Sequence, residues 1–273
     1  MSTAWSAWLD TRFPTGLPDL PQAASSAALC PLSGQAILSV AGPEAIQFLQ
    51  GQVTTDMRET EKGRVLPGAI CSLKGRALFT FMAIPVPDGV LLLMPVDQLD
   101  AAFAHLKKYS IFSKVTLQAD PESYALFGIV AASANVVSPL LRELIPDLPA
   151  IGQSVRMADG MVIATLADGR ILLAMPSSNL HAFLERIPAS IEITTENAWR
   201  LSSIRAGLAA VQSDTRDHFQ PQELNYPALE GVSYNKGCYT GQEIVARLYF
   251  RGKLKQRLYR LEAMTTAPAP GSA

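Results

Sequence analysis

The strands predicted in this 273-residue chain come in pairs joined by short glycine turns, and not singly between helices. Residues 69–84 form an apolar run divided by Lys74-Gly75, and residues 161–175 form another divided by Asp168-Gly169. A dipeptide that ends in glycine between two apolar runs indicates a β-hairpin. Paired strands favour antiparallel or mixed sheets over a doubly wound parallel sheet. We therefore expect an α+β fold.

The same order of elements (strand, helix, hairpin, strand, helix) is predicted twice along the chain. Helices are expected where apolar residues recur three and four positions apart, as in Leu99, Phe103 and Leu106 after the capping residue Asp97. A chain of this length favours about two domains. We expect a loose arm over 1–28, lobes over 29–115 and 116–243, and a separate end over 244–273. Helices are expected at 43–50, 97–106, 138–145, 177–187 and 196–208, and further strands at 36–40, 90–94, 115–117, 124–130 and 191–194.

The end of the chain is rich in cations. Residues 244–249 and 255–261 are typical of two strands around Arg251-Gly252. In a strand, residues 251, 253, 255 and 257 share one face, and like charges on one face favour an anionic partner such as RNA phosphate or a polyglutamate tail. A solvated edge strand protected by its charges explains the pattern equally well. The cations are Arg247, Arg251, Lys253, Lys255, Arg257 and Arg260.

Composition and charge exclude several classes of protein. The net charge of -1 gives no overall attraction to nucleic acid or to an anionic membrane. The first 20 residues lack a basic start and are interrupted by Pro14 and Pro18, unlike a signal peptide, and no apolar run approaches the roughly 18 residues of a spanning helix. We expect a cytoplasmic monomer without membrane contact and with three free cysteines. Isolated histidines and the lack of paired-cysteine motifs give no support to a metal site.

One loop carries the strongest chemical signal. Cys238 lies between two glycines and two residues after Lys236. Glycines permit positive φ and a close backbone approach to a ligand, and a nearby cation favours the thiolate. Tyr239 can stack on a planar ring, and Gln242 can offer an amide. A buried structural cysteine before a helix start is the competing interpretation.

This loop, continued to Arg247 and to Phe250-Arg251-Gly252, resembles the signature of the YgfZ family of folate-binding proteins. That family is related to the aminomethyltransferase of the glycine cleavage system. Stretches at 48–56, 106–115 and 219–225 resemble the same family. The resemblance implies a two-lobed α+β, aminomethyltransferase-like fold with a central folate pocket, followed by a β-barrel of which this chain holds only the start. The signature octapeptide is Lys236, Gly237, Cys238, Tyr239, Thr240, Gly241, Gln242 and Glu243.

The resemblance also implies binding residues for tetrahydrofolate or a folate derivative. Trp199 matches a tryptophan that lines the family's pocket. The other pocket tryptophan falls at Gln35, which removes a stacking surface. Arg205 stands where the sister enzyme has a pteridine-binding glutamate, and Tyr239 is the stacking candidate of the signature. Cys238 is the candidate functional thiol, and no residue is assigned as catalytic.

The acids that serve carbon transfer in the sister enzyme are missing. Their strand matches residues 75–80, where Phe79 and Thr80 stand instead. A carboxylate there would orient and polarise the folate amine. The leading hypothesis is a folate-binding helper in iron–sulfur protein assembly or repair and tRNA modification, whose Cys238 loop contacts the ligand or a client protein. A folate-dependent aminomethyl or methyl transferase, and an RNA-binding module using residues 247–260, remain open alternatives.

Overall fold

Both predicted hairpins are present, and they belong to two different sheets. The first joins strands β3 and β4 through Gly75, and the second joins β9 and β10 through Gly169. These glycines have φ of 70° and 83°, which side chains disfavour. The computed structural model describes residues 8–11, 13, 16–17, 27–130, 144–145, 147–188 and 191–262.

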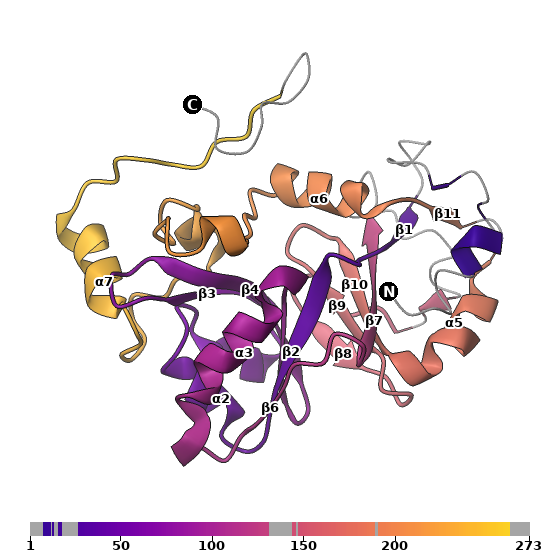
Figure 1. Ribbon diagram of the computed structural model, residues 1–273, viewed down its shortest axis with the longest axis horizontal. Coiled ribbons are helices and arrows are strands. Elements are labelled where there is room, and N and C mark those ends of the chain that lie inside the picture. Colours follow the sequence, from indigo (N-terminus) through magenta and orange to yellow (C-terminus); the bar gives the residue numbers. More distant parts are fainter. Residues whose placement is uncertain are drawn as a thin grey trace.

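The first sheet is antiparallel throughout and has the strand order β3-β4-β5-β2-β6. Helices α2 and α3 cover its outer face (Figure 1), where Phe48, Leu49 and Leu106 pack on Leu38 and Leu92. The elements are β2 (Gln35–Ala41), α2 (Ala45–Gln50), β3 (Leu66–Cys71), β4 (Ala77–Val86), β5 (Gly89–Pro95), α3 (Leu99–Lys107) and β6 (Thr116–Gln118).

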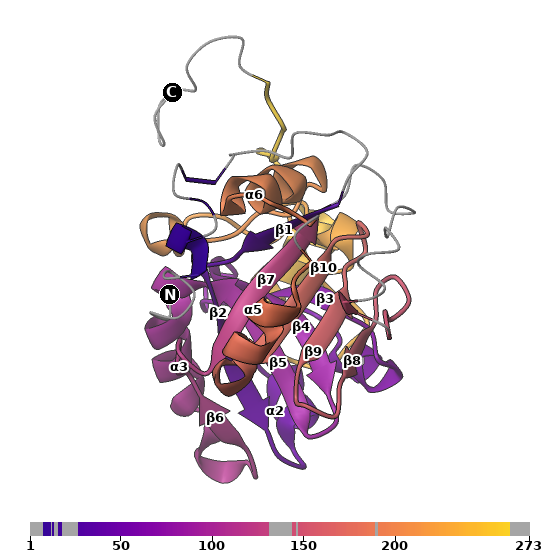
Figure 2. The same cartoon turned by 90° about the vertical axis from the view of Figure 1, so that its right-hand side faces the viewer.

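The second sheet has the order β11-β1-β7-β10-β9-β8, in which β1 and β11 form the one parallel pair among the described strands. Helix α5 covers its outer face (Figure 2), with Phe183 packed on Phe127 of β7. The elements are β1 (Ala28–Pro31), β7 (Tyr124–Val130), β8 (Ser154–Arg156), β9 (Val162–Thr165), β10 (Ile171–Pro176), α5 (Leu180–Arg186), β11 (Glu192–Ile193) and α6 (Glu196–Arg205).

The two sheets share one core. Ile37 and Leu91 of the first sheet pack in the same buried cluster as Leu126 and Leu172 of the second. Along β7 the side chains alternate, so that Phe127 faces α5 while Leu126 faces the shared core, as the period of two in a strand requires. The predicted two-sheet α+β fold is therefore confirmed.

Short 3-10 helices occupy several of the connections. Two of them occupy the first residues of the helices predicted at 97–106 and 177–187. The α-helices α3 and α5 therefore begin a few residues later than expected. These elements are η1 (Met57–Lys62), η2 (Val96–Gln98), η3 (Ser110–Phe112), η4 (Ser177–Asn179), η5 (Ser213–Thr215) and η6 (Tyr226–Leu229).

The expected strands at the C-terminal end are wrong. Residues 242–251 form helix α7 (Gln242–Arg251), and residues 252–262 run as extended chain without a strand partner. The physical reason is that Ile244, Val245 and Leu248 are spaced for a helix as well as for a strand, and Val245 is fully buried against β3 and β4. The cations at 251, 253, 255 and 257 consequently share no strand face.

The expected domain boundaries remain a prediction, but two strands near these boundaries belong to the sheet of the other lobe. β1 lies in the second sheet although residue 29 was expected to open the first lobe, and β6 lies in the first sheet although it follows residue 115. Most of the arm over 1–28 and of the helix expected over 138–145 falls outside the described residues. Within the described part of the chain, no helix is long and apolar enough to cross a membrane.

Candidate functional site

A cavity of about 500 Å³ lies between α6 and the inner strands of the first sheet. Its walls come from α6, β4, β5, the loop over 207–212 and the extended chain over 258–261. This volume is in the range of pockets that hold a small organic molecule. Its lining includes Gln35, Thr80, Arg170, Trp199, Arg200, Ser203 and Arg260.

Trp199 lines this cavity and is buried, with 4% of its surface exposed. Its ring fills the space left by Gly128 on the inner face of β7, where an added Cβ would lie 2.9 Å from the ring atom Cζ3. Gly128 is required because α6 packs closely on β7 at this point, and not because its φ angle is unusual. The sequence places one small residue in β7 so that α6 can lie close to the sheet.

Arg170 places a cation beside the tryptophan. The guanidinium carbon lies 4.2 Å from the centre of the Trp199 ring. Its nitrogens donate to Asp168 Oδ2 at 2.7 Å and to Ser203 Oγ at 2.6 Å. Burial lowers the pKa of Arg170, while the Asp168 carboxylate opposes that shift. Arg170 is thus a buried, ion-paired cation that holds the Trp199 ring in place, and it is not a free charge for a ligand.

No aspartate or glutamate lines the cavity in the described part of the chain, whereas Arg170, Arg200 and Arg260 do. Thr80, at the position of a missing acid, uses its hydroxyl oxygen to accept from the backbone nitrogen of Val211 at 2.8 Å. The hydroxyl therefore holds the loop after α6 in place. The cavity favours an anionic ligand and offers no carboxylate base for carbon transfer.

The structure brings together some of the predicted binding residues and separates others. Trp199, Gln35 and Thr80 line one cavity, although Gln35 and Trp199 are 164 positions apart in the chain. Arg205 is exposed at the end of α6, and Tyr239 is buried elsewhere, and neither lines this cavity.

Two cavity residues carry no sequence signal that singles them out. Arg170 follows the Asp168-Gly169 turn, where a cation is typical of an exposed strand start, and Ser203 lies within an ordinary helical stretch. Their roles depend on the packing of α6 across β10, which local patterns do not encode.

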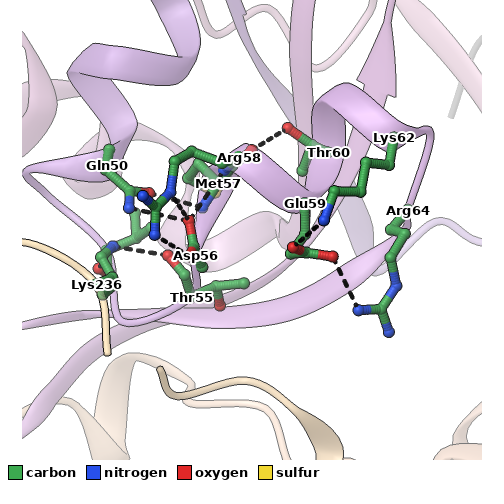
Figure 3. Close-up of polar contacts among 11 residues, drawn as sticks. Gln50, Thr55, Asp56, Met57, Arg58, Glu59, Thr60, Lys62, Arg64 and Lys236 are labelled. Carbon is green, nitrogen blue, oxygen red and sulfur yellow. Dashed lines mark hydrogen bonds and ion pairs between the residues drawn. The ribbon is translucent and has the colours of Figure 1, made fainter. Parts of the chain in front are cut away.

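Lys236 of the signature is a buried anchor (Figure 3). Its amine donates to the carbonyl oxygens of Val53 and Thr55, both at 2.7 Å, and 6% of the residue is exposed. Burial lowers the pKa of this amine to about 7, although the nearby Asp56 carboxylate opposes the shift. The lysine attaches the signature loop to the segment that follows α2.

Asp56 organises the other side of this anchor. Its carboxylate accepts from Arg58 Nη2 at 2.6 Å and from Gln50 Nε2 at 3.0 Å (Figure 3). The hydrogen bond from Arg58 is the main cause that lowers the pKa of Asp56 to about 2. Gln50 in turn accepts from the Met57 backbone nitrogen at 2.7 Å. The segment over 50–58 is thus a fixed platform for the signature loop.

Cys238 is exposed, and it lies apart from the cavity of Trp199. It borders a separate surface hollow with Gln50, Arg58 and Glu61. The interpretation of Cys238 as a buried structural residue is therefore wrong. Of the two flanking glycines, Gly241 has the expected positive φ, at 81°, while Gly237 lies in open space without a positive φ.

The buried amine of Lys236 predicts a pH-dependent stability. Its pKa is about 7 in the folded chain and near 10.4 when unfolded, so the unfolded chain binds more protons between these values. The free energy of unfolding should therefore rise by about 1–2 kcal/mol from about pH 7 to 8.5, as measured by urea titration. At higher pH the opposite contribution of Cys30 and Cys71 begins, because burial raises the pKa of both to about 12.

The matched variant is Lys236→Met, which keeps the chain length and removes the titrating amine. Its free energy of unfolding should be lower, and the rise over this pH range should disappear. An equal rise in both proteins would show that another group causes it.

Comparison with known proteins decides the family. The tRNA-modifying protein YgfZ of Colwellia psychrerythraea is 30% identical over 254 residues, which cover 92% of this chain and 76% of the relative. The tRNA-modifying protein YgfZ of Yersinia enterocolitica is 32% identical over 246 residues, which cover 89% of this chain and 73% of the relative. The chain belongs to the YgfZ family. No family model matches it.

The solved structures agree with this assignment to the YgfZ family at the level of the fold. The match to the glycine cleavage system aminomethyltransferase T of Bartonella henselae covers 82% of this chain and 64% of the aminomethyltransferase chain. Its TM-score is 0.67, and the sequence identity is 18%. At that identity the likeness shows the fold alone. The two sheets of this YgfZ-family chain are thus arranged as in an aminomethyltransferase.

Proposed function

We propose that this chain binds tetrahydrofolate or a close derivative in the cavity of Trp199 and acts as a cytoplasmic accessory protein in tRNA modification. The observation that carries the proposal is that Trp199, Gln35 and Thr80 line one cavity. Three arginines border the same cavity, and no acid does so among the residues that the structure describes. The name of the YgfZ relatives supports the role in tRNA modification, and the aminomethyltransferase-like fold supports folate as the ligand.

The chemistry of the lining fits this ligand. A pteridine is planar and can lie against the part of Trp199 that borders the cavity, while the glutamate carboxylates of a folate are anions that suit Arg200 and Arg260. The same lining lacks the carboxylate that would polarise a folate amine. These residues support binding without carbon transfer, and they make the transferase alternative the weaker one. Detection of aminomethyl transfer by the purified protein would reverse that order.

Gln35 offers a gain-of-affinity test of this proposal. It borders the cavity at the start of β2 and presents no aromatic surface. Gln35→Trp should tighten tetrahydrofolate binding about tenfold in calorimetry, since an aromatic contact contributes about 0.5–1.5 kcal/mol. Arg186→Ala, an exposed cation on α5, should leave the affinity unchanged. A wild-type protein that takes up no tetrahydrofolate would remove the folate half of the proposal.

We also propose that the exposed thiol of Cys238 serves the support of iron–sulfur proteins. The fixed platform beneath the signature loop holds this thiol at the surface, where a client protein can reach it. In cells that lack their own YgfZ gene, Cys238→Ser should restore less than half of the iron–sulfur enzyme activity that the wild type restores, at equal protein abundance. Full complementation by the serine variant would show that the sulfur is not needed.

An RNA contact through the C-terminal cations is the second candidate function. A specific observation favours it: α7 and the chain that follows carry six cations between residues 247 and 260 against one acid, Glu243, in residues 242–260. In the described part of the chain, none of these cations forms an ion pair. Phosphates would neutralise them, and binding of tRNA would then weaken steeply with salt.

A further inference from the structure

Three aromatic rings meet where α7 packs on the segment just before the signature loop. Tyr234 and Tyr249 are stacked with ring centres 3.8 Å apart and an angle of 14° between planes. Phe250 stands edge-on to Tyr249 at 4.9 Å. Tyr249 and Phe250 nevertheless expose 57% and 66% of their surfaces. A stacked pair with one ring open to solvent can accept a further planar group.

A hollow of about 300 Å³ adjoins this cluster and contains unsatisfied polar atoms. Tyr234, Tyr249, Gln222, Asn225 and Arg257 line it. Gln222 is only 8% exposed, and its amide nitrogen donates to the Val245 carbonyl oxygen at 2.7 Å. Its Oε1 atom and the buried hydroxyl of Tyr234 make no hydrogen bond of good geometry, although the Gln222 amide lies close enough to that hydroxyl to oppose the rise that burial gives the pKa of Tyr234.

Such atoms favour a polar ligand. A buried acceptor without a donor destabilises the protein, and a ligand that brings an N–H group removes this penalty. The planar, amine-bearing edge of a nucleobase matches both the open ring and the free amide oxygen. A peptide would also bring N–H groups, but it would not explain the stacked ring together with the surrounding unpaired cations.

We propose that this hollow binds one unpaired base of an RNA, which stacks beside Tyr249 and donates to Gln222 Oε1. The cations at 247–260 then hold the neighbouring phosphates. The inference rests on the RNA contact proposed above and adds to it a preference for unpaired over paired RNA. A duplex could satisfy the cations but could not insert a base, because its bases are stacked within the helix.

The test compares two labelled RNAs with equal numbers of phosphates, one a stem–loop and the other a blunt duplex, by fluorescence anisotropy at fixed salt. The wild type should bind the stem–loop more tightly. Tyr249→Ala should weaken stem–loop binding about tenfold, since it removes the ring on which the base stacks, and should leave duplex binding unchanged. Tyr249→Phe should retain the preference, because it keeps the ring. Arg257→Ala should weaken both complexes to a similar extent.

Phe112 provides a matched control, because it is 97% exposed in a lysine-rich segment outside this hollow. Phe112→Ala should change neither affinity. Equal binding of both RNAs with no effect of Tyr249→Ala would overturn the base site and keep the RNA contact. Failure to bind either RNA would overturn both. If Tyr249→Ala weakens binding of an acidic peptide and does not weaken binding of the stem–loop, the hollow belongs to a protein partner and the proposal is overturned.

Discussion

Replacing Gly128 with alanine should destabilise the protein and weaken ligand binding in the cavity together. Gly128 lies on the inner face of β7 directly against the Trp199 ring, and the new methyl group would occupy space that the ring already fills. Overpacking of this kind costs about 1–3 kcal/mol. We expect urea unfolding to show a loss of that size, and calorimetry to show tetrahydrofolate affinity reduced by about tenfold or more, because the displaced ring closes the cavity.

Gly51→Ala is the matched control. The nearest atom to its added Cβ would be the Phe48 carbonyl oxygen at 3.7 Å, which is an ordinary contact, and its φ is -84°. This variant should be as stable as the wild type or slightly more so. Equal stability of the Gly128 and Gly51 variants would contradict the packing of α6 on β7.

Removal of the Trp199 ring should have the second large effect. Trp199→Ala deletes a side chain that is 96% buried in the shared core, which costs about 3–5 kcal/mol of stability. It also removes the aromatic surface beside Arg170, so tetrahydrofolate binding should fall below detection in calorimetry. Trp199→Phe separates the two effects, since it keeps a smaller ring and a folded chain. Its affinity should fall about tenfold.

A Trp199→Phe protein that is folded and binds as tightly as the wild type would place the ligand elsewhere. A loss of affinity without a change in the unfolding midpoint would show that the ring acts on the ligand directly, and not through stability alone.

The sheets were predictable because hairpin turns and alternating burial are local properties. Gly75 and Gly169 mark their turns in the sequence, and the helices over the outer faces follow from apolar spacing. Helix α7 was not predictable in this way, since its short apolar spacing fits a strand equally well and burial of Val245 on another element decides the outcome.

The candidate site was predictable only in part, through the resemblance. It indicated Trp199 and Gln35, which the fold brings into one cavity. Arg170 and the chain over 258–261 were missed because their places depend on tertiary packing. The unpartnered oxygen of Gln222 is likewise invisible in sequence, since it arises where a loop and α7 enclose an amide.

The most direct test of the account is a crystal structure of the protein with tetrahydrofolate. We predict ligand density against Trp199, with the glutamate carboxylates toward Arg200 or Arg260, and none beside Cys238. Ligand bound at Cys238, or an empty Trp199 cavity at saturating tetrahydrofolate, would contradict the assignment of this cavity as the folate site.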